Sequence, residues 1–392
     1  MSPTARMYAD YNATAPLRPE AKAAMLRAFE LTGNPSSVHG EGRRVRTLVE
    51  GARESVAAAI GACRDDIAFT SGGTEAVAAP LRAALTALGQ ASLFHASAIE
   101  HDAVASIAGE FATHAPVRPL ATASSAWIVG RDGRVDLEQL AVVVKAEAAG
   151  GFRPLVSLML VNNETGVIQP VAEAAEIAHA AGGLIHCDAI QALGKIETSI
   201  IELDVDYLSL SAHKVGGPQG VGAFYVKPGA PFQAIQTGGG QEFGRRAGTE
   251  NVAGIAGFGA AVDAALEGLG AYQALAEHRD RMEARLTDAV PGVVVHGAGA
   301  PRVAGVSCFG LEGVPSETQV MNMDLAGFAV SAGSACSSGK VKPSRVLTAM
   351  RLSEDMARSS IRASFGWNSR SEDFDALAEA WLTMAARIQK RR

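Results

Sequence analysis

Residues 155–161 read LVSLMLV, a continuous apolar run near the middle of the chain. A short run of this kind, without helical periodicity, is typical of a strand that is buried on both faces. Such strands occur in parallel sheets whose two faces are covered by helices. The run therefore predicts an α/β fold.

Other short apolar runs flank this stretch and alternate with helical patterns. We expect strands at 67–70, 183–187, 206–210 and 221–226, and helices at 74–88 and 170–181. Alternating strands and helices indicate a mostly parallel sheet. Ligands bind at the carboxyl ends of the strands in such sheets, so the residues that follow each run are candidates for a functional site.

The pattern changes after about residue 251, where two Ala- and Leu-rich helices are expected at 252–269 and 271–289. Short elements follow them: strands at 293–296, 303–309, 328–331 and 361–364, and helices at 316–324, from 343, and at 372–389. This pattern predicts a smaller α+β domain, to which the first dozen residues cross over. The predicted division is a large domain at 14–255 and a small domain made of 1–13 and 256–392.

Composition excludes several classes of protein. With 392 residues, 48% hydrophobic and 19% charged, the chain is not disordered, collagenous or a coiled coil. A net charge of -6 argues against nucleic-acid binding. Four scattered cysteines indicate reduced thiols and neither a disulfide scaffold nor a zinc site. No signal peptide and no run of 18 apolar residues is visible, so we expect a cytoplasmic protein without a membrane span or a metal.

The strongest chemical signal is SLSAHKVGGP at 209–218, where Lys214 follows a predicted strand. A partly buried lysine at this place can stay uncharged enough to form a Schiff base. The alternative is a surface lysine in a turn. Lysines are scarce in this sequence, and the neighbouring Ser211, His213 and glycines favour the chemical interpretation.

Two further signals follow other strands. Asp188 ends an apolar strand, where a carboxylate requires a cationic partner such as a protonated pyridine, although a helix N-cap is an equal alternative. TSGGTE at 70–75 places Gly73 and Thr74 at a helix N-terminus, which suits a phosphate group or is simply a cap. A lysine, a buried acid and a phosphate cradle together match pyridoxal 5'-phosphate (PLP).

Two polar residues could complete this site. His101 could lie on the cofactor ring or shuttle protons, or it could be a structural histidine. The amide of Asn163 could bond the cofactor's phenolate oxygen, or it could form an Asx turn before Gly166.

With these residues in place, the chain resembles the cysteine desulfurases, PLP enzymes of fold type I in the class V aminotransferase superfamily. The matching segments are YADYNATAP (8–16), GNPSSVH (33–39), FTSGGTE (69–75), VNNETG (161–166), HCDAIQ (186–191), SAHK (211–214), GGGQE (238–242), RAGTEN (246–251), SAGSAC (331–336) and SSIR (359–362). They run in order from end to end. The resemblance implies a large cofactor domain, a small domain carrying a catalytic cysteine loop, and a homodimer with its active sites at the subunit interface.

The resemblance also implies residue roles. Lys214 would hold the cofactor, Asp188 would pair with its ring nitrogen and His101 would stack on the ring. Further roles fall to Asn163 and Gln191 at the phenolate, to Gly73, Thr74, Ser211, His213 and the partner subunit's Thr249 at the phosphate, and to Arg362 at the substrate carboxylate. Val77, Ala78 and Phe243 depart from the residues that many members carry, at positions expected either behind the residues that line the site or in the substrate channel.

Cys336 decides the function. It lies in a small, polar segment beside Lys340 and Lys342, which favour a thiolate, whereas Cys63, Cys187 and Cys308 have apolar or strand contexts. The resemblance implies removal of sulfur from L-cysteine, giving alanine and a persulfide on Cys336. The sulfur would pass to an acceptor or scaffold protein for iron–sulfur assembly or thio-modification. The alternatives are a selenocysteine lyase, another class V lyase or aminotransferase, or a non-catalytic PLP-binding subunit.

Overall fold

The computed structural model describes residues 6–89, 92–112, 129–333 and 343–389. Its large sheet has the strand order β2-β7-β6-β5-β4-β3. The bounds are β2 Ile67–Thr70, β3 Ser92–Ala96, β4 Arg153–Met159, β5 Leu184–Asp188, β6 Tyr207–Ser211 and β7 Gly222–Val226. Only β7 in this sheet runs against its neighbours, so the carboxyl ends of the other strands meet at one edge. The predicted α/β fold with a mostly parallel sheet is confirmed.

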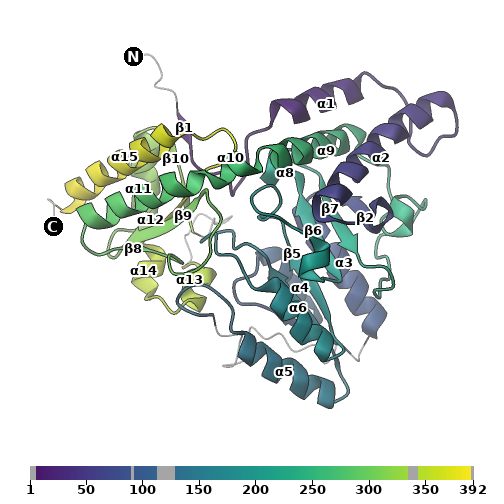
Figure 1. Ribbon diagram of the computed structural model, residues 1–392, viewed down its shortest axis with the longest axis horizontal. Coiled ribbons are helices and arrows are strands. Elements are labelled where there is room, and N and C mark those ends of the chain that lie inside the picture. Colours follow the sequence, from purple (N-terminus) through teal and green to yellow (C-terminus); the bar gives the residue numbers. More distant parts are fainter. Residues whose placement is uncertain (1–5, 90–91, 113–128, 334–342, 390–392) are drawn as a thin grey trace.

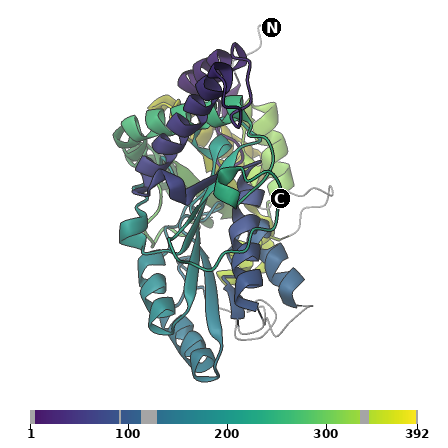
Figure 2. The ribbon, with the colours of Figure 1, turned by 90° about the vertical axis from the view of Figure 1, so that its right-hand side faces the viewer.

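Helices cover both faces of this sheet (Figure 2). On one face lie α3 Gly73–Leu88 and α4 Asp102–Ala112, and on the other lie α5 Leu137–Ala149 and α6 Val171–Ala180. The strands between them have almost no exposed residue, as expected for a sheet covered on both sides. The short helices α7 Ile200–Leu203 and α8 Ala212–Val215 flank β6.

Three helices form a layer beside the sheet: α1 Pro19–Phe29, α2 Gly40–Ile60 and α9 Val252–Glu267 (Figure 1). A Cβ added at Gly259 would lie 2.6 Å from the Ala52 Cα, so α2 and α9 approach each other closely only because residue 259 is glycine. In the described part of the chain no single helix is long and apolar enough to span a membrane. A bent pair of helices, residues 252–267 and 269–289 at 64° to each other, has the length and composition of a membrane span but no other feature of one. The packing of α9 against α1 and α2 accounts for the apolar face of its first helix.

The rest of the chain forms a smaller group around an antiparallel sheet, β11-β12-β9-β8. Its elements are α10 Leu269–Gln273, α11 Leu275–Ala289, β8 Val293–Val295, β9 Val306–Leu311, α12 Ser316–Leu325, β10 Phe328–Ala329, β11 Ser331–Ala332, α13 Arg345–Ala349, α14 Glu354–Arg358, β12 Ser360–Ser364 and α15 Ser371–Gln389. The strand β1 Met7–Tyr8 pairs with β10, and Asp10 bridges to Ser364. Chain segments from both ends therefore meet here, while the predicted domain boundaries remain a prediction.

Several predicted bounds were wrong. The strand expected at 155–161 is β4, which ends at Met159 because the Asn162 side chain accepts backbone N–H bonds from the turn that follows. The strand expected at 303–309 begins only at Val306. Residues 328–331 form two short strands with different partners, and the helix expected at 252–269 ends before Gly268. The sequence also did not predict α1, α2, α4, α5, α7, α8, α14, β1 and β3.

Candidate active site

A cavity of about 410 Å³ lies at the edge where the parallel strands end. Apart from Thr249 and Cys336, it brings together every predicted site residue. These are Gly73 and Thr74 after β2, His101 after β3, Asn163 after β4, Asp188 and Gln191 at and after β5, Ser211, His213 and Lys214 at and after β6, and Arg362 from β12. Segments far apart in the sequence thus supply one site, as the rule for parallel sheets predicts.

The two exceptions differ in kind. Thr249 is exposed and does not line this cavity, whereas Cys336 lies outside the described residues. Of the other cysteines, Cys187 and Cys308 are buried as expected, and burial raises the pKa of both thiols. Cys63 is exposed, which corrects the apolar context expected for it.

Val77, Ala78 and Phe243, expected behind the site or in the substrate channel, do not line the cavity described above. Val77 is fully buried in a core cluster on α3, and Ala78 packs against the same cluster. Phe243 is half exposed, and its ring lies 5.1 Å from the Arg53 guanidinium carbon. None of the three lines the cavity in the described part of the chain, so they do not shape it directly.

Lys214 lies in α8, directly after β6. Its Nζ donates to the backbone carbonyl oxygens of Asn12 and Ala13, at 2.6 and 2.8 Å. Burial and then the charge of Arg362 lower the pKa of Lys214 to about 8, against the opposing effect of nearby carboxylates. At pH 7 about a tenth of this amine is therefore uncharged and nucleophilic, far more than for an ordinary lysine.

Two buried carboxyl groups lie in the cavity wall. Asp188 ends β5, where its Oδ1 accepts the Ile190 N–H at 3.0 Å, and burial raises its pKa. Glu100, which the sequence did not single out, accepts from the Met159 N–H at 2.7 Å and from the Ser97 hydroxyl at 2.9 Å. Burial and then the charge of Asp188 raise the pKa of Glu100 to about 8. A cation placed beside this pair would favour ionised Asp188.

Another part of the cavity has the features of an anion site. Gly73 opens α3, and a Cβ added there would come within 3.1 Å of the Ser211 Cβ. The buried Ser211 hydroxyl has no hydrogen-bond partner among the described residues. His213 bonds the Thr14 hydroxyl at 2.8 Å, and burial lowers its pKa to about 4, so the ring is neutral. A helix N-terminus and an unpartnered buried hydroxyl together fit a phosphate group.

Arg362 is buried in β12 and is held from two sides. One Nη donates to Asp10 Oδ1 at 2.7 Å and the other to the Asn163 carbonyl oxygen at 3.0 Å. Its Nε has no partner in the part of the chain that the structure describes. The guanidinium is thus fixed in place with donor capacity left for a carboxylate.

His101 and Glu164 complete the polar wall of the cavity. The Ala103 N–H donates to Nδ1 of His101 at 3.1 Å, so a neutral ring carries its proton on Nε2. Glu164, also missed by sequence reasoning, accepts from the Ser344 hydroxyl at 2.6 Å, and burial raises its pKa to about 7. Glu100 precedes His101 and Glu164 follows Asn163, so both missed glutamates adjoin residues that the sequence singled out. Their burial distinguishes them from other glutamates, and burial is not visible in the sequence.

The donor set fits PLP. An amine of lowered pKa, a buried carboxyl group and an unpartnered hydroxyl at a helix N-terminus match the aldehyde, the pyridine nitrogen and the phosphate of that cofactor. Among the described residues no cluster of His, Cys, Asp and Glu side chains could hold a metal ion.

Comparison with known proteins agrees with this geometry. Residues 7–377 match the Aminotransferase class-V family. The cysteine desulfurase of Cereibacter sphaeroides is 42% identical over 377 residues, which cover 95% of this chain and 94% of that protein. A solved NifS-like protein is 30% identical with a TM-score of 0.88, covering 97% of this chain and 99% of its own. SspA, solved in complex with cysteine, is 26% identical with a TM-score of 0.76, covering 92% and 98%.

Proposed function

The chain belongs to the aminotransferase class-V family and is a PLP-dependent cysteine desulfurase, and on this premise we propose how its own residues divide the reaction. The observation that carries the proposal is the convergence of Lys214, Asp188 and Arg362 on one cavity. Each has the state its role requires: an amine with a pKa of about 8, a buried carboxyl group and a fixed guanidinium with a spare donor.

Cofactor binding uses most of the cavity wall. Lys214 would hold the aldehyde carbon and Asp188 the ring nitrogen, while His101 would cover the ring. The phenolate oxygen would accept from Asn163 and Gln191, and the phosphate would bind Gly73, Thr74, Ser211 and His213. Bound PLP supplies the electron sink that makes the α-proton of an amino acid removable.

Substrate handling falls to Arg362 and Lys214. Arg362 would bind the α-carboxylate of L-cysteine, with Asp10 and the Asn163 carbonyl fixing its plane. Lys214 Nζ, once free of the aldehyde, takes the α-proton, which its lowered pKa allows near neutral pH. The SspA complex with cysteine supports a cysteine substrate for a site of this fold.

Sulfur transfer is assigned to Cys336, which lies outside the described residues. Its thiolate attacks the substrate sulfur, so that an Sγ–S bond forms and the C–S bond breaks. The electron pair of that bond stays with the substrate carbon, which takes up a proton and leaves as alanine. The enzyme then carries a persulfide for iron–sulfur assembly or thio-modification.

The chain is proposed to act as a homodimer in the cytoplasm. Thr249 is compatible with this, because it is exposed and does not line the cavity of its own chain, so its side chain is free to bind the phosphate in a second copy. A sulfur-acceptor or scaffold protein would receive the persulfide. The free thiols of Cys63, Cys187 and Cys308 are compatible with a reducing compartment.

A Cys336→Ala variant tests the function. We expect it to bind PLP, with the cofactor fixed to Lys214 by borohydride, yet to release neither sulfide nor alanine from L-cysteine. Wild-type protein after one turnover without reductant should carry one extra sulfur, seen by mass spectrometry on the Cys336 peptide and on no peptide with Cys63, Cys187 or Cys308. Full cysteine turnover by the variant would contradict the proposal and indicate another lyase. Retention of selenocysteine activity alone would indicate a selenocysteine lyase.

A further inference from the structure

Lys195 is a buried lysine that the mechanism above does not use. Its residue is 6% exposed, and it follows Gln191 in the turns after β5. The Lys195 amine donates to Asn12 Oδ1 at 2.8 Å and to Gln191 Oε1 at 2.5 Å. Both acceptor residues line the active-site cavity, whereas Lys195 itself stands behind them.

The surroundings of Lys195 favour an uncharged amine. Burial, and then the charges of Lys214 and Arg362, hold the pKa of Lys195 well below its usual range. An uncharged amine has two N–H donors, which matches its two acceptors in the described part of the chain. A buried polar contact of this kind adds little net stability over an apolar side chain of similar shape, so orientation of its partners is the more specific role for it.

The hydrogen bonds of Lys195 belong to a network that includes the backbone carbonyl of Asn12. This carbonyl also accepts from Lys214, the lysine proposed to hold the cofactor. Gln191 Nε2 donates to the Asn12 carbonyl oxygen at 2.9 Å, and Lys214 Nζ donates to the same oxygen at 2.6 Å. The two ends of a glutamine amide have nearly the same shape, so a neighbour must choose between them. Lys195, as a donor, requires Oε1 on its own side, and the Asn12 carbonyl, as an acceptor, requires Nε2 on the other side.

We propose that Lys195 is a positioning residue for the desulfurase: its amine holds the Asn12 side chain through Oδ1, beside the backbone carbonyl that accepts from Lys214, and helps to turn the Gln191 amide so that its NH₂ group serves the cofactor. The proposal rests on the proposed function, in which Lys214 and Gln191 hold PLP. It predicts that Lys195 acts through Gln191 and Asn12 and has no separate contact with the ligand.

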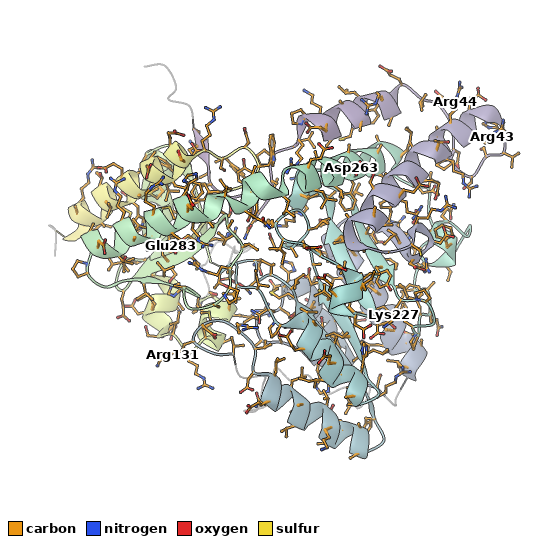
Figure 3. All side chains as sticks on the ribbon, in the orientation of Figure 1. Arg43, Arg44, Arg131, Lys227, Asp263 and Glu283 are labelled. Atoms are coloured by element: carbon orange, nitrogen blue, oxygen red, sulfur yellow. The ribbon has the colours of Figure 1, made fainter. Side chains whose placement is uncertain are left out.

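The test is a double-mutant cycle on the equilibrium dissociation constant of PLP. Lys195→Met keeps the length of the side chain but removes both donors, and we expect it to weaken PLP binding by about tenfold, the effect of leaving buried acceptors without donors. Lys227→Met is the matched control, because Lys227 follows β7 and pairs with Asp204 at 2.6 Å on the half of the molecule that holds the large sheet (Figure 3). It should bind PLP as wild type does.

The cycle separates positioning from general damage to the fold. If Lys195 acts through Gln191, Lys195→Met should cost little extra affinity in a Gln191→Ala background. Fully additive losses, or wild-type affinity in Lys195→Met, would overturn the proposal.

Two controls keep the outcome interpretable. Lys195→Gln stays polar but cannot reach both oxygens, so it should also lose affinity, and it replaces Lys195→Met should that variant not fold. Borohydride reduction of wild type must fix PLP to Lys214. If it does not, the proposed function fails; if it does and the Lys195 variants bind normally, only the positioning role fails.

Discussion

Lys214 and Asn12 stand 202 positions apart in the sequence, yet the amine of the one donates to the backbone carbonyl oxygen of the other at 2.6 Å. Because the acceptor belongs to the backbone, it cannot titrate and it holds Nζ in place in either protonation state. The N-terminal segment therefore contributes to the reactive lysine directly, although it lies in neither the β6 strand nor the helix that carries Lys214.

The first prediction concerns the reactivity of Lys214 in the cofactor-free protein. With its pKa at about 8, its labelling by an amine-directed acylating reagent should rise through about pH 8, well below the value of ~10.4 for a lysine in a model peptide. Arg362→Gln removes the positive charge that lowers this pKa, so the midpoint should move upward. Quantitative peptide mass spectrometry over a pH series measures both, and a wild-type midpoint near the ~10.4 of an exposed lysine would contradict the burial argument.

The second prediction concerns Asp188. Asp188→Asn keeps the shape of the side chain and its place at the end of β5 but removes the charge that would pair with the ring nitrogen. We expect kcat to fall on the order of 10² or more, as when a group that stabilises developing charge is removed. Rates are compared at equal PLP occupancy, measured by absorbance. A near-native rate would show that Asp188 does not have this role.

The third prediction concerns the pH dependence of stability through Glu100. Its pKa in the folded protein is about 8, above the ordinary value of 4.5. Stability that comes from the protonated form is complete below about pH 4.5 and is lost as the pH rises to about 8. Glu100→Gln cannot ionise and keeps an oxygen for the Met159 and Ser97 donors, so it should gain stability relative to wild type across this range.

Urea unfolding of the cofactor-free protein at several pH values measures this difference. The cofactor-free protein is used because PLP binds only the native state and would itself raise the free energy of unfolding. Each unit by which folding shifts the pKa of Glu100 changes the free energy of unfolding by ~1.4 kcal/mol over this range. A constant difference between Glu100→Gln and wild type from pH 5 to pH 8 would show that Glu100 is ionised throughout.

The fourth prediction compares two Arg–carboxylate pairs. The Arg362–Asp10 pair is largely buried, with side chains 7% and 17% exposed, whereas Arg358–Glu354 is 51% and 70% exposed, and both have an N–O distance of 2.7 Å. Asp10→Asn should lower the free energy of unfolding by about 1–3 kcal/mol, because it weakens a charged hydrogen bond to a buried guanidinium. Glu354→Gln should cost less than about 1 kcal/mol. Equal costs in urea unfolding would contradict this ranking.

Prediction from sequence succeeded where a strand is a continuous apolar run. β4 comes closest to such a run. β5 (LIHCD) and β6 (YLSLS) were also predicted, although both carry polar residues, and Asp188 and Lys214 at their ends do meet in one cavity. β3, which carries the polar residues Ser92 and His95, was not predicted. Ser92 donates to the nearby Gly89 carbonyl oxygen at 2.7 Å, whereas His95 bonds the distant Glu147 on α5. Their burial is therefore visible only in the folded chain.

The sequence by itself determined the α/β class, the edge of the sheet that carries the site, and the chemical groups gathered there, because local periodicity and the order of elements are written in neighbouring residues. Tertiary structure alone decided the pKa values of these groups and their hydrogen-bond partners. The lowered pKa of Lys214, the raised pKa of Glu100 and the contacts of Lys195 all depend on burial and on charges from distant segments. Desolvation and Coulomb interactions act through space, and the distances that set them exist only once the chain has folded.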